Sequence, residues 1–359
     1  HGKRFIGMNG NTRMYAGSGQ TTDTITQYGI TWTFDKPYEY GQYANGDWWV
    51  QTDSTTKTVK ITSITPTFTG TRNGWEANPS SITKQGFDSR AESFDATLVP
   101  ATPTPTSPYI AQPGTSIVKA ISEPDPSPST KTYLTTAAIL TIVASPPAPN
   151  DFRPPYFGNN KPLYSTSNLR TDLLPTFAPT PSAPSLASIK QNFERVQLVH
   201  MWKWMGDKIH PRLNMPDYGA NIATRNAEGA LRLMLNDQVS AKMPALITYV
   251  QQGIDIQGIL ANGGKWPAMG GHDLGMKLPA IFAAILLNDQ VLKDRVSKSA
   301  YNTFAEDGNV HTGFNAGRAL WGGTDRCATE RMYWQDISDP TQGDKTCLDP
   351  YSYIDGGSI

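Results

Sequence analysis

The chain has 359 residues, enough for two average domains, and its 31 basic and 31 acidic side chains cancel to a net charge of zero. That balance argues against a nucleic acid as main partner, since phosphate binding normally leaves a basic surplus, and the lack of any run of about 18 apolar residues predicts no membrane span. Only 17% of residues are charged, below the roughly 25% of average soluble domains, which favours a secreted, extracellular protein.

Residues 1–145 show a pattern of short β-strands. Ile30–Phe34 alternates between apolar and polar residues, and Leu134–Val143 is a longer apolar run that is typical of a buried strand. Asn-Gly pairs, which favour tight turns, begin at three positions, namely Asn9, Asn45 and Asn73. Short strands separated by frequent turn signals predict an antiparallel β-sandwich domain over 1–145.

Residues 146–184 form a proline-rich region, for example at Pro146–Pro149 and Ala178–Pro184. Polyproline-like backbone makes a semi-rigid spacer. Large apolar side chains between the prolines indicate that the region packs against something; they are Phe152, Tyr156, Phe157, Tyr164, Leu169 and Leu173. We therefore expect an ordered linker that is wrapped on a domain surface.

Residues 185–359 change to a helical pattern. Ser185 is a candidate helix cap, and apolar residues then recur three and four positions apart as far as Trp202. Further helices are expected over Tyr218–Leu235, Ala241–Leu260, Leu274–Leu287 and Val291–Phe304. This succession predicts an array of α-hairpins with long loops, followed by a loop-rich C-terminal part.

The loop Gly263–Lys277 is the first candidate for a binding site. Its five glycines allow the backbone to approach a ligand closely. Trp266 is the candidate platform for a sugar ring, Lys265 and Asp273 are candidate substrate ligands, and His272 is a candidate base. The alternative interpretation is that Trp266 belongs to the core and that His272 caps a helix.

A second polar loop lies between the first two predicted helices and contains His210, Arg212, Asn214 and Tyr218. The two loops are expected to meet at one rim. A lyase acting on uronic acid polymers must neutralise a carboxylate, remove the C5 proton and protonate the leaving oxygen. His272 or Tyr218, with His210 as a further candidate, suits the proton transfers. Arg212, Lys265 or Asn214 suits the carboxylate.

The sequence patterns for glycoside hydrolysis and for metal binding are weaker. A glycoside hydrolase needs two carboxylates, for which Asp217, Asp273, Glu306 and Asp307 are candidates. His272, Asp273 and His311 lack a metal-ligand spacing, so no metal and no cofactor is predicted. Cys327 and Cys347 are either a disulfide, which suits a secreted protein, or two free thiols.

Two segments resemble a known group of proteins. They are Gly29–Lys36 with Tyr40–Val50, and Asn214–Gly219 through Gly264–His272. They resemble uncharacterised secreted bacterial proteins that have a β-rich N-terminal domain. The helical part is similar to the (α/α) toroids of alginate and heparinase-type polysaccharide lyases. The resemblance covers most of residues 5–290 and implies a partial toroid over 185–359 and an extracellular glycan as ligand or substrate.

The sequence therefore predicts an α+β multidomain protein that is carbohydrate-active and polysaccharide lyase-like. Its partner would be a polysaccharide or another glycan. Two alternatives stay open, a sugar-binding module without catalysis and a structural protein that assembles into a homo-oligomer, a filament or a surface layer. The low charge supports the structural alternative, because a weakly charged surface permits self-association.

Overall fold

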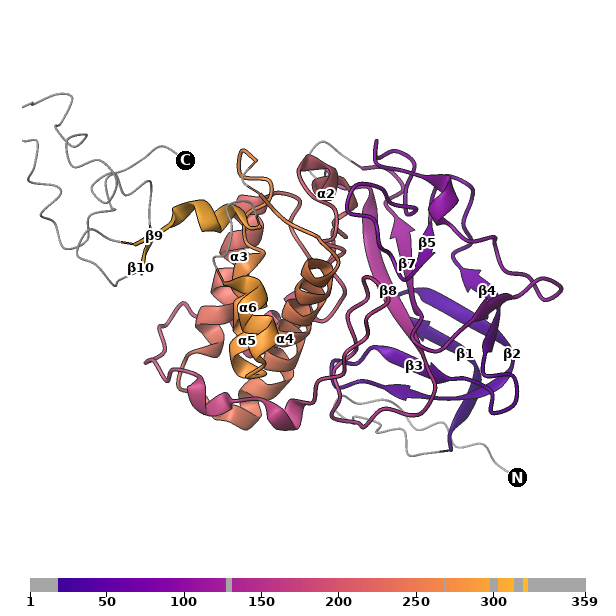
Figure 1. Cartoon of the computed structure of the whole chain (residues 1–359), viewed down its shortest axis with the longest axis horizontal. Helices are drawn as coiled ribbons and strands as arrows, with labels where there is room; N and C mark the ends of the chain where they lie inside the picture. Colours follow the sequence, from indigo (N-terminus) through magenta and orange to yellow (C-terminus); the bar gives the residue numbers. More distant parts are fainter. Residues whose placement is uncertain (1–18, 127–130, 268, 298–302, 313–318, 322–359) are drawn as a thin grey trace, which may run out of the picture.

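A computed structural model describes residues 19–126, 131–267, 269–297, 303–312 and 319–321. The strands gather in the N-terminal half and the helices in the C-terminal half, and the two groups lie side by side (Figure 1). Among these residues, no helix is both long enough and apolar enough to cross a bilayer.

The N-terminal half is one curled mixed sheet. Its strands follow the order β5-β7-β8-β3-β2-β4-β6, and β1 pairs with β2. All of these pairs are antiparallel except β3–β8, which is parallel. The prediction of an antiparallel β-sandwich is therefore wrong. The strands are β1 (Thr21–Gln27), β2 (Ile30–Gln42), β3 (Trp48–Gln51), β4 (Val59–Thr65), β5 (Trp75–Ala77), β6 (Tyr109–Ala111), β7 (Ser116–Ser122) and β8 (Leu134–Val143).

The sheet curls because β2 is long and changes partners along its length. Its first residues, Ile30–Phe34, pair with β1 and β4, whereas its last three, Tyr40–Gln42, pair with β3. The alternating apolar side chains of the first part, Ile30, Trp32 and Phe34, are buried inside the curl. Strand β2 thus joins two parts of the sheet. The sheet curls over its own apolar face, so a second sheet is not needed to cover it.

Strand β8 is buried on both faces, as its continuous apolar run predicts. Ala138, Leu140 and Ile142 point into the curl, whereas Ala137 and Ile139 belong to the cluster formed with the helices. The predicted buried strand over Leu134–Val143 is confirmed.

Within the described residues, the C-terminal half contains six α-helices and only 29% of residues are helical, so the predicted helical toroid is wrong. A central helix, α4, packs against α1, α3, α5 and α6, whereas a toroid would be a ring of helix pairs. The helices are α1 (Leu186–Phe193), α2 (Trp204–Ile209), α3 (Gly219–Leu233), α4 (Val239–Ala261), α5 (Lys277–Leu286) and α6 (Gln290–Val296). A short hairpin of β9 (Val310–Thr312) and β10 (Ala319–Trp321) follows.

The first helix begins where the sequence predicts and ends earlier. Ser185 caps α1, because its side chain accepts a hydrogen bond from Ser188 N at 3.0 Å. The helix stops at Phe193, although the apolar spacing continues to Trp202. Leu198 has a φ of 46°, which is incompatible with a right-handed helix, and its side chain is fully buried. Tertiary packing therefore overrides the local helical pattern here.

The proline-rich region passes between the sheet and the helices. Phe152, Tyr156 and Phe157 are fully buried in the cluster that also holds β7, β8 and the helices. The Arg153 side chain lies at the centre of a buried ion cluster. It donates to Asp255 on α4 through Nη1 at 2.9 Å and Nη2 at 2.5 Å, and to Asp47 through Nε at 2.6 Å. The domain boundaries at 145 and 184 stay predictions.

A buried carboxyl group in β5 predicts a pH-dependent stability. Burial raises the pKa of Glu76 to about 7, and Gly86 N donates to its Oε1 at 2.6 Å. A raised pKa stabilises the folded protein below the pKa of the unfolded state, and this contribution is lost as pH rises through about 7. Compared with the wild type, Glu76→Gln should gain about 3 kcal/mol of unfolding free energy between pH 4.5 and well above pH 7.

Urea unfolding of both proteins across that pH range measures the difference. The matched control is Glu92→Gln, because Glu92 is exposed. A difference between wild type and Glu76→Gln that does not change with pH would show that Glu76 is ionised at little cost.

Candidate functional site

The two predicted loops meet where α3 begins. The Tyr218 hydroxyl donates to Gly270 O at 2.6 Å, and the Tyr218 ring meets the His272 ring edge-on at 5.1 Å between centroids. The neighbouring Gly219 has no room for a side chain, because a Cβ there would lie 2.2 Å from Gly271 O. The start of α3 therefore fixes the backbone that carries His272.

A hydrogen-bonded pair of His272 and Asp207 lies beside this contact. His272 Nδ1 and Asp207 Oδ2 are 2.7 Å apart, and the His272 side chain is 32% exposed. Burial raises the pKa of Asp207 to about 6, while the hydrogen bond from His272 acts in the opposite direction. Near neutral pH most of Asp207 is ionised and accepts the Nδ1 proton, which leaves Nε2 of His272 as the nitrogen that can take up a proton.

A second carboxyl group anchors the element that carries Asp207. Asp273 Oδ1 accepts a hydrogen bond from Lys203 N at 2.7 Å, just before α2 begins. Burial, reinforced by the charge of Asp207, raises the pKa of Asp273 to about 7. Lys203 has a φ of 59° and a ψ of −161°, a strained backbone for a residue with a side chain. Asp273 thus holds a strained turn that places Asp207 against His272.

Two ammonium groups extend the site along one tryptophan. Lys203 Nζ lies 4.2 Å and Lys265 Nζ lies 5.2 Å from the centre of the Trp202 ring. Cations are attracted to the face of an indole, so Trp202 holds both lysines in place. The main-chain N–H of Lys203 also donates to Asp273, the residue after His272, so the backbone segment that carries Trp202 and Lys203 is bonded to the His272 loop.

Trp266 is buried in the core and is not exposed as a platform for a ligand would be. It is 2% exposed, its ring is stacked on Phe304 at 5.6 Å, and its Nε1 donates to Val199 O at 2.9 Å. This is the core position that was the alternative interpretation of the sequence, and we do not assign Trp266 a role at the site.

The other predicted residues lie mostly inside the protein. Burial lowers the pKa of His210 to about 4, so this ring is neutral at pH 7. Asn214 is fully buried and donates to Val196 O at 2.5 Å. Arg212 is exposed and donates to Glu123 Oε2 at 2.9 Å, so it contacts the segment after β7. The structure therefore brings together His272, Asp273 and Tyr218, whereas Lys265 contacts Trp202.

The acids Glu306 and Asp307, which were candidates for glycoside hydrolysis, make structural bonds instead. Glu306 accepts from Gly275 N at 2.7 Å, and Asp307 pairs with Lys277, so both acids fix the end of the glycine-rich loop. Within the described ranges no cluster of three or more histidine, cysteine or acidic side chains is arranged to bind a metal ion. The predicted disulfide, Cys327 with Cys347, and the His311 side chain lie outside the described residues.

Sequence reasoning missed Asp207 and Lys203. Lys203 precedes α2 and Asp207 lies within it; this helix is only six residues long and follows a segment that the apolar pattern assigns to a helix. The available signal was the group Trp202-Lys203-Trp204, which is followed closely by Asp207 and Lys208. Its meaning depends on the distant loop that supplies His272.

Comparisons of this chain with known protein families, with curated proteins and with solved structures found no match.

Proposed function

We propose that the protein is a secreted, carbohydrate-active enzyme that cleaves a uronic-acid-containing extracellular glycan by β-elimination. The observation that carries this proposal is the partly exposed His272, which is paired with the buried carboxylate of Asp207. Two ammonium groups, those of Lys203 and Lys265, lie against Trp202 on segments joined to the same loop. A paired imidazole suits proton transfer near neutral pH, and the ammonium groups suit an anionic sugar.

His272 can act first as the base and then as the acid of this elimination. His272 Nε2 removes the C5 proton of a uronate, and the electrons of that C–H bond form the C4–C5 double bond while the C4–O4 bond breaks. The imidazolium then returns the same proton to O4 of the leaving sugar. Asp207 stabilises the imidazolium through the hydrogen bond to Nδ1. No oxidant or added water is required.

The lysines supply the second requirement of this reaction. Removal of the C5 proton places negative charge on the uronate carboxylate, and a cation beside that group stabilises the transition state. Lys203 and Lys265 take this role in place of Arg212 and Asn214. Tyr218 fixes the loop through Gly270, and its ring edge orients the imidazole.

The test is a panel of alginate, polygalacturonate and glycosaminoglycans, followed by the ultraviolet absorbance of the C4–C5 double bond. We expect the wild type to form this product on at least one polymer. His272→Ala should lower the rate by about 10²–10⁴-fold, the usual contribution of a general acid–base group. Asp172→Asn is a control, because Asp172 is exposed and its hydrogen-bond partner is the nearby Arg170, not a residue of the His272 site.

No unsaturated product from the wild type on any polymer would sink the proposal. Retention of a polymer by the wild type without product would assign the site to sugar binding. A chain that forms large particles in light scattering, and that neither binds nor cleaves a polymer, would favour the structural alternative.

A further inference from the structure

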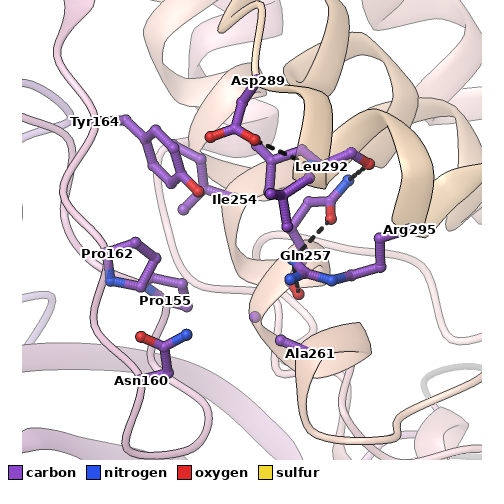
Figure 2. A pocket seen from close by; sticks show the side chains of 12 residues that line it. Pro155, Asn160, Pro162, Tyr164, Ile254, Gln257, Ala261, Asp289, Leu292 and Arg295 are labelled. Carbon is purple, nitrogen blue, oxygen red and sulfur yellow. Dashed lines mark hydrogen bonds between the residues drawn. The ribbon is translucent and has the colours of Figure 1, made fainter.

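A separate cavity of about 210 Å³ lies between the proline-rich region and helices α4 and α6. Figure 2 shows Pro155, Pro162 and Tyr164 on one side and the helical residues on the other. It shares no lining residue with the His272 site. Its packing is tight at one edge, where a Cβ on Gly258 would lie 2.2 Å from Pro155 Cβ.

Some polar atoms of the side chains that line this cavity make no hydrogen bond to a described residue. Arg295 Nη1 donates to the main-chain and side-chain oxygens of Gln257 at 3.3 and 3.2 Å. Gln257 Nε2 in turn donates to Ala280 O and Leu292 O, so Gln257 is fully engaged and orients the guanidinium. Nε and Nη2 of Arg295 have no hydrogen-bond partner within the part of the chain that the structure describes.

An acceptor lies at the other end of the cavity. Asp289 Oδ1 accepts from Leu292 N at 3.1 Å and caps α6, while Oδ2 makes no hydrogen bond to a described residue. Asn160 adds an amide, and the Tyr164 hydroxyl can both donate and accept. The single acid and the single guanidinium cancel, so the cavity has no net charge and favours a neutral ligand.

The rest of the lining is apolar. Prolines on one wall face Ile254 and Leu292 on the other. A ligand that matches this lining has apolar CH faces and a rim of hydroxyl groups. Cavities for drug-sized ligands measure about 300–1,000 Å³, so this smaller one suits a single ring.

We infer that this cavity binds one neutral pyranose ring, with Arg295 and Asp289 holding hydroxyl groups at opposite ends and the prolines and Ile254 contacting its CH face. The site lies outside the elimination chemistry, and the inference does not rest on the proposed function. A neutral terminal sugar of a glycan chain, or a free monosaccharide, has this chemistry.

Saturation-transfer NMR with methyl glycosides of glucose, galactose and N-acetylglucosamine at millimolar concentration tests the inference. The wild type should transfer saturation to at least one of them. Arg295→Met should weaken its binding on the order of tenfold, which corresponds to the loss of one or two hydrogen bonds. Val291→Trp should also abolish binding, because Val291 is 61% exposed at the cavity and a larger side chain there fills the space.

Matched controls separate this site from folding and from the His272 site. Asp294→Asn alters an exposed residue of the same helix that does not line the cavity, and it should bind as the wild type does. His272→Ala should also bind normally. No transfer to any glycoside, equal binding by Val291→Trp with an unchanged melting temperature, or binding of a zwitterion such as glycylglycine in place of the glycosides would each overturn the inference.

Discussion

Arg153→Met is expected to lower the free energy of unfolding by about 3–5 kcal/mol, the largest effect of any single substitution proposed for this protein. The methionine fills similar space, yet it leaves the carboxylates of Asp47 and Asp255 buried without their cation. An uncompensated buried charge is costly, and these two acids come from the turn between β2 and β3 and from α4. Equilibrium unfolding in urea measures the change.

Arg170→Met is the matched control for this prediction. Arg170 also forms a two-point ion pair with an aspartate, Asp172, but both side chains are largely exposed. Exposed pairs contribute about 0–1 kcal/mol, so this variant should unfold almost as the wild type does. Equal losses in the two variants would mean that the Arg153 cluster does not join the sheet to the helices.

Gly219→Ala is expected to disrupt the site with a smaller loss of stability. Its added methyl group would lie 2.2 Å from Gly271 O and 2.4 Å from His272 O, and main-chain atoms cannot rotate away as a side chain can. Overpacking of this kind costs about 1–3 kcal/mol. The loop must shift, which separates His272 from Asp207 and removes the proton signal of the hydrogen-bonded Nδ1–H in NMR spectra.

Ala220→Ser tests whether the effect is specific. Ala220 is the next residue of the same helix and is exposed, so the Nδ1–H signal should persist in this variant. A normal signal in Gly219→Ala would show that the loop is not held by the close approach of α3.

Local patterns predicted single elements of this fold better than their arrangement. The helix over Ala241–Leu260 and the strand over Leu134–Val143 are present almost as expected, because each follows from the apolar pattern of its own residues. The parallel pairing of β3 with β8 joins residues about ninety positions apart, and no local pattern carries that information. The curled sheet and the central position of α4 were therefore missed.

The site shows the same division between local and distant information. Glycines in Gly263–Lys277 indicated a close approach of the backbone to a ligand, which stays a prediction; the close approach in the structure is to Gly219 and Tyr218 of the same chain. Trp266 and His272 lie six residues apart in this loop and are equal candidates by residue type. Their different burial follows from Phe304 and Asp207, which come from distant parts of the chain.

If the His272–Asp207 pair performs proton transfer, the rate of double-bond formation must change as pH is raised through about 6. Asp207 must be ionised to hold His272, and its pKa is raised to about 6. We predict that the wild-type rate rises with pH through this value, and that Asp207→Asn lowers the rate at every pH of the range. A wild-type rate that is independent of pH in this range, or an Asp207→Asn variant with the wild-type rate, would contradict this role of the pair.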